Sequence, residues 1–311
     1  MQNIQRVLVT GGAGFIGSAS VDLLLQQEKQ VVVLDNLYSG KLENLPLQHP
    51  NLEFVEGDIL EYSLVENLLV GCDAVLHLAA IPSVPFSIDN PIYTFQVNTQ
   101  GFLHVLQAVH QAKRSIRLVY ASSAAVYGDV KSLPCRDDEL LTSQPLSPYA
   151  LQKWQCEEYA NLYVHLHQLP SLGLRYFNVY GLRQDPASPY SGVITRFLDA
   201  YHQEKELTVF GDGMQSRDFI HVSDVARANV FALQSHFAGA VNIATGSQET
   251  LLQLIDYISQ AGKHAAQIEF QPARIGDIKE SYAAVKLAEQ HLGFKYTVSL
   301  KDGISRFFVT A

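Results

Sequence analysis

The sequence predicts an α/β fold, with a doubly wound parallel sheet and a smaller, interleaved C-terminal α/β lobe. Two observations favour the sheet: short β-rich runs alternate with helical patterns through about residue 175, and a glycine-rich turn directly follows the first run. A third observation favours the interleaved lobe. Beyond that point the alternation loosens without a repeat, a low-complexity tract or a clean linker.

The first half of the chain supplies five predicted strands with helices between them. The strands are "VLVT" (7–10), "VVVLD" (31–35), "LEFVEGD" (52–58), "AVLHLAA" (74–80) and "IRLVYASS" (116–123). The helices are "GSASVDLLLQQ" (17–27), "YSLVENLL" (62–69) and "TFQVNTQGFLHVLQAVHQA" (94–112). Such alternation predicts parallel strands with helices on both faces of the sheet.

The second half is less regular. Its predicted elements are short strands near 207–210, 218–222 and 240–243 and helices near 191–204, 223–235 and 250–261. We therefore assign residues 1–175, together with about 218–245, to the domain of the large sheet. Residues 176–217 and 246–311 form the second lobe.

Composition and charge favour a globular enzyme. The 311 residues are 47% hydrophobic, and the net charge is −9 without a basic run, which argues against a nucleic-acid partner. No apolar run approaches the ~18 residues of a membrane span. The start "MQNIQRVLVT" lacks the basic and apolar regions of a signal peptide. The three cysteines and the "HLH" at 165–167 show no metal-ligand spacing, so we expect a reduced, cytoplasmic protein without a metal.

The first predicted strand runs directly into a glycine-rich turn, "VLVTGGAGFIGS", which opens a helix. Glycines here allow a tight turn and let the backbone approach a pyrophosphate, while the helix N-terminus offers free N–H groups to the phosphates. This context predicts a Rossmann-type dinucleotide site rather than an ordinary turn. Its contact residues would be Gly11, Gly14, Phe15, Ile16 and Gly17.

The second predicted strand ends in an acidic residue, Asp35, followed by Asn36. A carboxylate at this position binds the ribose hydroxyls of a dinucleotide. Its negative charge would repel a 2′-phosphate. The sequence therefore favours NAD over NADP as the cofactor.

Four Tyr-x-x-x-Lys stretches begin at Tyr127, Tyr149, Tyr201 and Tyr282, so the spacing alone proves little. "SPY" at 147–149 has the residues of a helix N-cap and first turn, which puts its tyrosine and the following lysine on one helical face. Tyr127 precedes Gly128 in the turn-like "YGDV", a poor setting for a helical pair. Of the other three stretches, only the one at Tyr149 closely follows the fifth strand, whose end should open on the cofactor crevice. We therefore select Tyr149 and Lys153.

Motifs along nearly the whole chain have a shared order and spacing. They are "TGGAGFIGS", "DN" at 35–36, "GDI" at 57–59, "HLAA" at 77–80, Asn98, "SSAAVYG", "SPYALQK", "RYFNVYG" and "GDGMQSRDFIHV". With them the chain resembles the extended short-chain dehydrogenase/reductases, specifically the nucleotide-sugar epimerase/dehydratase family. Within it, the chain is most similar to UDP-hexose 4-epimerases. "SVPFS" at 83–87 and "GLRQDP" at 181–186 resemble the branch that acts on N-acetylated sugars.

The resemblance implies roles for the catalytic and cofactor residues. Tyr149 would take the proton of the C4 hydroxyl as hydride leaves for NAD, helped by Lys153 and Ser123. A free tyrosine has a pKa near ~10, so Lys153 and the nicotinamide charge should lower it. We expect His77 to be a strand histidine whose ring is hydrogen-bonded within the fold, rather than a catalytic residue. The further cofactor contacts implied are Asp58, Ile59, Leu78, Ala79, Ala80, Asn98 and Tyr176.

The resemblance also implies the substrate site of a UDP-sugar. Arg217 and Arg274 would bind the diphosphate, because guanidinium groups match phosphate oxygens. The other contacts implied are Ser83, Ser87, Ser123, Asn178, Val193 and Ser281. The alignment at Ser281 depends on counting from "R-x-G-D", and a slip of one residue would place Tyr282 at the sugar instead.

The residues after Ser123 bear on the reaction type. Dehydratase relatives carry acid and base carboxylates directly after that serine, and decarboxylase relatives a glutamate one position later, whereas this chain has Ala124 and Ala125. Methyl groups transfer no protons, so a 4-epimerase that retains NAD is predicted. The alternatives are another NAD-dependent nucleotide-sugar enzyme, such as a reductase, dehydratase or decarboxylase, and a non-catalytic NAD-binding regulator.

Two departures from the family pattern remain. The common "DxxK" reads "AAVK" at 283–286, and "AAIPSVPFS" lacks a lysine that is common near the nicotinamide. Apolar faces on the predicted helices 93–112 and 147–168 favour a homodimer joined through a four-helix bundle.

Overall fold

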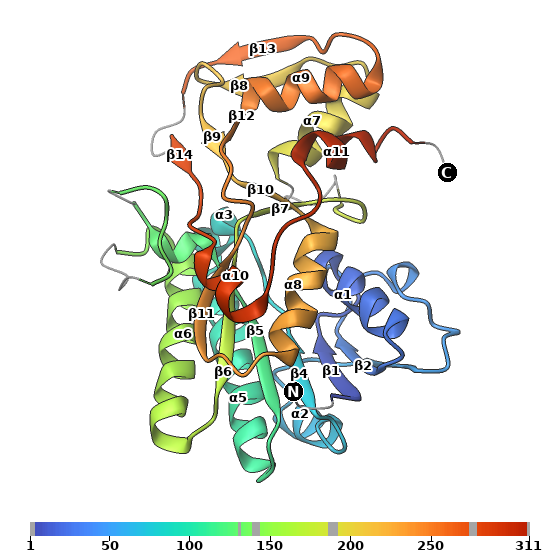
Figure 1. Cartoon of the computed structure of the whole chain (residues 1–311), viewed down its shortest axis with the longest axis vertical. Helices are drawn as coiled ribbons and strands as arrows, with labels where there is room; N and C mark the ends of the chain where they lie inside the picture. Colours follow the sequence, from blue (N-terminus) through green and yellow to red (C-terminus); the bar gives the residue numbers. More distant parts are fainter. Residues whose placement is uncertain (1–3, 130–131, 139–143, 186–191, 274–278, 310–311) are drawn as a thin grey trace.

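A computed structural model of the chain describes residues 4–129, 132–138, 144–185, 192–273 and 279–309. Its centre is a seven-stranded sheet in the order β11-β6-β5-β4-β1-β2-β3, and every neighbouring pair is parallel (Figure 1). The strands are β1 (Arg6–Thr10), β2 (Gln30–Asp35), β3 (Leu52–Glu56), β4 (Ala74–His77), β5 (Arg117–Ser123), β6 (Ser171–Tyr176) and β11 (Gly239–Ile243). This confirms the predicted doubly wound parallel sheet.

The strand order reverses between β1 and β4. From β1 the chain proceeds outward through β2 to β3, then returns to the other side of β1 and continues through β4, β5 and β6. In open α/β sheets, ligands bind in the crevice that such a reversal leaves at the carboxyl ends of the strands. The glycine-rich turn after β1 lies at this point.

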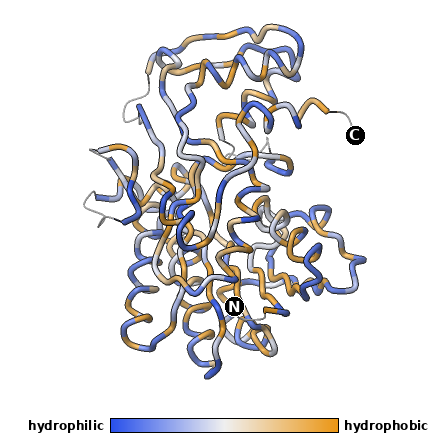
Figure 2. Tube along the Cα trace, viewed as in Figure 1, coloured by the Kyte–Doolittle hydropathy of each residue, from blue (hydrophilic) through white to orange (hydrophobic). Residues whose placement is uncertain are grey.

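Helices cover both faces of the sheet. The helices α1 (Phe15–Gln26) and α8 (Val222–Gln234) pack together on one face, and α2 (Tyr62–Leu68), α5 (Gly101–Gln111) and α6 (Pro148–His167) lie on the other. Alternate residues of each strand serve the two cores: Val7 and Val9 join the first, and Leu8 joins the second. Figure 2 shows hydrophobic residues concentrated along the strands between these layers.

One predicted helix is interrupted. Where the sequence predicts one helix over 94–112, the chain forms α4 (Pro91–Phe95), a π-helical turn (Gln96–Gln100) and then α5. The cause is tertiary: the Asn98 side chain accepts from the Ile81 N–H (2.7 Å) and donates to the Ile81 carbonyl (3.1 Å). π-helical turns are rare and often occur inside α-helices at functional sites.

The second lobe is built from short strands around its own core. Its strand pairs are β7 (Asn178–Tyr180) with β10 (Phe219–His221), β8 (Leu207–Phe210) with β13 (Ile268–Gln271), and β9 (Ser216–Arg217) with β12 (Glu249–Thr250) and β14 (Glu280–Ser281). Its helices are α7 (Val193–His202), α9 (Leu251–Gly262) and α11 (Leu300–Ser305), whereas α10 (Lys286–Leu292) joins the core of the large sheet. Because α8 and β11 return to the large sheet, this lobe is interleaved with it, as the sequence predicts.

A short helix, α3 (Val84–Asp89), follows β4, and α10 packs beside α8 and β11. Within the described residues, no helix is long and apolar enough to cross a membrane.

Candidate active site

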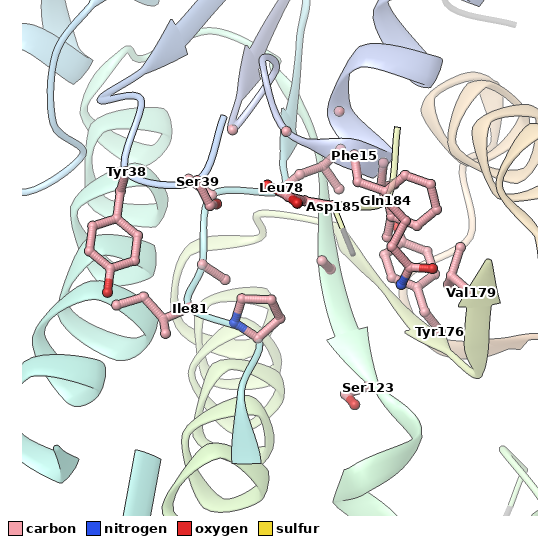
Figure 3. A pocket seen from close by; sticks show the side chains of 18 of the residues that line it. Phe15, Tyr38, Ser39, Leu78, Ile81, Ser123, Tyr176, Val179, Gln184 and Asp185 are labelled. Atoms are coloured by element: carbon pink, nitrogen blue, oxygen red, sulfur yellow. The ribbon is translucent and has the colours of Figure 1, made fainter. Parts of the chain in front are cut away.

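A cavity of about 760 Å³ opens at the carboxyl ends of the sheet strands, where the second lobe meets the sheet. Figure 3 shows Tyr38 and Ile81 on one side of it and Tyr176, Val179 and Gln184 on the other. Most of the predicted cofactor residues line this cavity. They are Gly11, Gly14, Phe15, Ile16, Gly17, Asp35, Asn36, Asp58, Ile59, Leu78, Ala79, Ala80, Tyr149, Lys153 and Tyr176.

The glycine-rich turn is shaped for close backbone approach. Gly11 has φ +71°, and a Cβ there would lie 2.7 Å from the Ala79 nitrogen. A Cβ on Gly17 would lie 2.0 Å from the Gly11 carbonyl oxygen. Only glycine fits both positions, and the 12-residue helix α1 then begins at Phe15 without a side-chain cap on its first N–H groups. This arrangement fits a bound pyrophosphate.

Asp35 is held in place at the end of β2. Its Oδ2 accepts from the Ala13 N–H (2.9 Å) and its Oδ1 from the Leu37 N–H (2.8 Å). Burial raises the pKa of this carboxyl, and these two hydrogen bonds oppose the rise. Beside it, the Asn36 amide donates to Asp58 Oδ2 (2.9 Å), so these two lining residues are fixed together.

The start of α6 brings together the predicted catalytic side chains. Ser147 caps the helix by accepting from the Ala150 N–H (3.1 Å), which confirms the predicted N-cap. The Ser123 side chain at the end of β5 accepts from the Ala125 N–H (3.2 Å) and interacts with the Tyr149 side chain, which favours the ionised form of the tyrosine. Lys153, one turn further along α6, donates from Nζ to the Ala121 carbonyl (2.9 Å). All three catalytic candidates line the same cavity.

Burial has the larger effect on the protonation of this pair. It raises the pKa of Tyr149, and the hydrogen bond with Ser123 only partly offsets this. It also lowers the pKa of Lys153. The lowered tyrosine pKa expected from the sequence is therefore not found in the protein alone, because the desolvation of a buried phenolate outweighs one hydrogen bond.

The tyrosines of the other three candidate pairs do not line the cavity as described. The Tyr127 hydroxyl bonds to Arg175 and Asn242 in the core. The Tyr201 ring stacks on His264 with centroids 4.2 Å apart. Tyr282 follows β14 in the second lobe.

His77 and Asn98 are buried and form hydrogen bonds with residues around the cavity. The buried His77 ring shares a hydrogen bond with the Thr10 hydroxyl (2.7 Å), and burial, followed by the charge of Lys153, lowers its pKa to about 3. It is therefore neutral at ordinary pH, as expected of a strand histidine. Besides its bonds to Ile81, Asn98 donates to Gln152 Oε1 on α6 (2.9 Å). Asn98 is buried and does not line the cavity.

The predicted substrate residues are only partly brought together. Asn178 and Val193 line the cavity beside Ser123. Arg217 and Ser281 are register partners on β9 and β14 and do not line it as described. Arg274 lies outside the described residues.

The two serines of "SVPFS" have structural partners. Ser83 caps α3 by accepting from the Phe86 N–H (3.1 Å). The fully buried Ser87 donates to the Val84 carbonyl (2.7 Å) and accepts from the Tyr149 N–H (3.1 Å). Ser87 therefore holds the first turn of α6 at the position of the tyrosine.

Several residues that line the cavity were missed in the sequence. Tyr38 and Tyr93 both line it, with ring centroids 6.1 Å apart. Lys41 forms an ion pair with Asp185 across to the second lobe (3.2 Å). The stretch after Asp35, "NLYSGK", was a usable signal for two of these residues, because it continues from a predicted cofactor contact.

Within the part of the chain that the structure describes, no group of three or more His, Cys, Asp or Glu residues could hold a metal ion.

Comparisons with known proteins agree with this geometry. Residues 7–244 match the model of the NAD dependent epimerase/dehydratase family. A putative UDP-glucose 4-epimerase of Methanocaldococcus jannaschii is 40% identical over 302 residues, which cover 96% of each chain.

Two solved structures are similar over nearly the whole chain. The UDP-N-acetylglucosamine 4-epimerase of Methanobrevibacter ruminantium, in complex with UDP-N-acetylmuramic acid, has a TM-score of 0.92 and 36% identity, covering 99% of each chain. The UDP-glucose 4-epimerase of Thermus thermophilus, in complex with NAD, has a TM-score of 0.87 and 36% identity, covering 97% of each chain.

Proposed function

The chain belongs to the NAD-dependent epimerase/dehydratase family, and from this premise we propose that it is a 4-epimerase of UDP-hexoses. The observation that carries the proposal is the set of Ser123, Tyr149 and Lys153 in one cavity with the glycine-rich turn. The similar epimerases from Methanobrevibacter and Thermus support it.

The cavity residues fit the cofactor of the family. The glycine-rich turn and the start of α1 would hold the pyrophosphate, Asp35 the ribose hydroxyls, and Asp58 with Ile59 the adenine. Lys153 would hold the nicotinamide ribose. When bound, NAD supplies the acceptor for the hydride of C4 and returns it in the second half of the reaction.

Tyr149 would act as the base at the C4 hydroxyl. In the protein alone its pKa is raised by burial, so its phenolate needs positive charge nearby. Lys153 supplies one charge from the same face of α6. The Ser123 hydroxyl, which already favours the ionised form of Tyr149, would stabilise the phenolate and contact the reacting hydroxyl.

The residues after Ser123 favour epimerisation over elimination or decarboxylation. Ala124 and Ala125 begin a short 3-10 helix (Ala124–Tyr127) directly after β5. Their methyl groups transfer no proton to a leaving hydroxyl or carboxylate. The 4-keto sugar would therefore take back its hydride after rotating in the site, which inverts C4. An intact Ser–Tyr–Lys set argues against a non-catalytic regulator.

The substrates proposed are UDP-GlcNAc and UDP-GalNAc, together with UDP-Glc and UDP-Gal. The test is to assay all four with the purified protein and to measure its bound nucleotide. Conversion of both pairs with NAD retained through turnover is the expected result. A protein that converts none of the four, or that consumes added NADH stoichiometrically, would instead be the reductase or the regulator.

The position of Asp35 predicts a preference for NAD over NADP. A 2′-phosphate would lie against this buried, fixed carboxylate, and like-charge contact should favour NAD by about 10- to 100-fold. Competition binding to protein stripped of nucleotide measures the ratio. Asp35→Ser should bring the affinities for NAD and NADP closer together. Glu56→Gln, which changes an exposed carboxylate at the end of β3, should leave their ratio unchanged. Equal affinity of the wild type for both cofactors would contradict the assignment.

We further propose that the protein forms a homodimer through the helices of residues 93–112 and 147–168. The exposed apolar side chains that carry this proposal are Phe95 on α4 and Leu151, Tyr159, Leu162 and Leu166 on α6, whereas the apolar side chains of α5 are mostly buried in the core of the large sheet. Two such faces could pair as a four-helix bundle. Light scattering should give twice the chain mass, and Leu162→Glu with Leu166→Glu should give the monomer. A monomeric wild type would rule out this arrangement.

A further inference from the structure

A buried ion pair lies beneath the proposed catalytic set. Arg175 on β6 donates from Nε to Glu157 Oε1 (2.9 Å) and from an Nη to Glu157 Oε2 (2.7 Å). The two side chains are only 7% and 5% exposed. A two-pronged pair of this kind fixes direction as well as distance.

Glu157 lies on the same face of α6 as the catalytic side chains. Tyr149, Lys153 and Glu157 are spaced four residues apart, which stacks them along one side of a helix. Glu157 also accepts a hydrogen bond from Ser122 (2.5 Å), the neighbour of Ser123 on β5. The Glu157 carboxylate therefore connects α6, the helix that carries Tyr149, to both β5 and β6.

The Arg175 side chain is itself held by several contacts. Across the sheet, Arg175 is the register partner of Ser122 on one side and of Asn242 on the other. Its remaining Nη donates to the Tyr127 hydroxyl (2.8 Å), which donates to Asn242 Oδ1 (2.7 Å). Its guanidinium also lies 5.0 Å from the Tyr127 ring centre. Glu157 is therefore paired with a side chain that is fixed by several contacts within the sheet.

We propose that Glu157, anchored by Arg175, is a positioning residue: it sets the rotation and height of α6 over β5 so that Tyr149 meets Ser123. The inference rests on the proposed epimerase function. Glu157 does not itself line the cavity and reaches its lining only through the hydrogen bond with Ser122, so it acts by holding α6 against β5. A misplacement of ~1 Å between reacting groups can cost about 10²-fold in rate, so loss of this anchor should appear in kcat.

Two variants separate positioning from stability. Glu157→Gln leaves the arginine charge buried without its counterion, so it should lower both Tm and kcat. The double change Glu157→Leu with Arg175→Met removes both charges, and apolar replacement of a buried pair is usually tolerated. It should restore Tm but not the anchor. Glu158→Gln, the same change at the exposed neighbouring residue, is the control.

The expected result is a kcat about 10- to 100-fold below wild type in both the single and the double variant, with KM within about 3-fold and normal NAD content. Glu158→Gln should match the wild type. Recovery of kcat together with Tm in the double variant would show that the pair serves stability alone and would overturn the proposal. A Glu157→Gln variant that loses only Tm would do the same.

A second measurement does not depend on the reaction. Hydrogen exchange of the amides at the start of α6 (148–153) should be faster in folded Glu157→Gln and in the double variant than in wild type, because α6 has lost its anchor. Unchanged exchange there would overturn the proposal. If the wild type epimerises none of the four UDP-hexoses, the proposed function fails, and the exchange result still decides whether Glu157 positions α6.

Discussion

Tyr149→Phe is expected to lower kcat by about 10²–10⁴-fold while the fold and NAD binding remain, because it removes only the hydroxyl of the proposed general base. Tyr149 is buried, and Ser123 at the end of β5 is the side chain that favours its ionised form. The backbone N–H of residue 149 would still donate to Ser87, so the first turn of α6 should keep its place. Turnover of UDP-Glc, with bound NAD as the measure of folding, gives the result.

Tyr159→Phe is the matched control for this prediction. Tyr159 lies on the same helix, is 37% exposed and does not line the cavity. It should keep wild-type activity. If Tyr149→Phe also turned over at nearly the wild-type rate, Tyr149 could not be the base, and the assignment of the whole Ser–Tyr–Lys set would fall with it.

The sheet could be predicted because its signals are local. Each strand from β1 to β5 is a short Val- and Leu-rich run, and the turn glycines at 11 and 17 are required by contacts with nearby backbone. The π-turn at 96–100 could not be predicted. It depends on hydrogen bonds between Asn98 and Ile81, which lie on different elements and leave no periodic pattern in the sequence.

The same distinction applies to the site. Tyr149 and Lys153 could be selected because a helix cap and a strand end flank them in sequence. The cavity residues Lys41 and Asp185 form an ion pair between the two lobes. Neither their residue types nor their spacing in the sequence predicts this contact. The protonation of Tyr149 also depends on burial, which is a property of the assembled fold. The Glu157 anchor is of the same kind, because its partner is on another strand.

Ser281→Tyr is expected to suppress the N-acetyl reaction about 100-fold and to spare the plain hexoses, because the new ring would occupy the space for the C2 acetamido group. The family resemblance aligns this position with a residue that is small in relatives accepting N-acetylated sugars and bulky in those restricted to hexoses. The alignment leaves open whether residue 281 or 282 faces the sugar.

The strand register favours Ser281. Ser281 on β14 pairs in parallel with Arg217 on β9, and register partners project to the same face of a sheet. Tyr282 is the first residue after β14, and in extended backbone consecutive side chains alternate, so we expect Tyr282 to turn toward the opposite face. If Arg217 grips the diphosphate, Ser281 is therefore the residue on the substrate side.

The measurement is the ratio of kcat/KM for UDP-GlcNAc to that for UDP-Glc, in wild type and in Ser281→Tyr. Ser305→Tyr, on an exposed turn of α11, controls for adding a tyrosine to the second lobe and should leave the ratio unchanged. A one-residue slip would instead make Tyr282→Ser the variant that gains N-acetyl activity. Equal loss of both reactions in Ser281→Tyr would mean that the tyrosine disturbs the lobe rather than the sugar pocket, because exclusion by a ring must depend on the group it excludes.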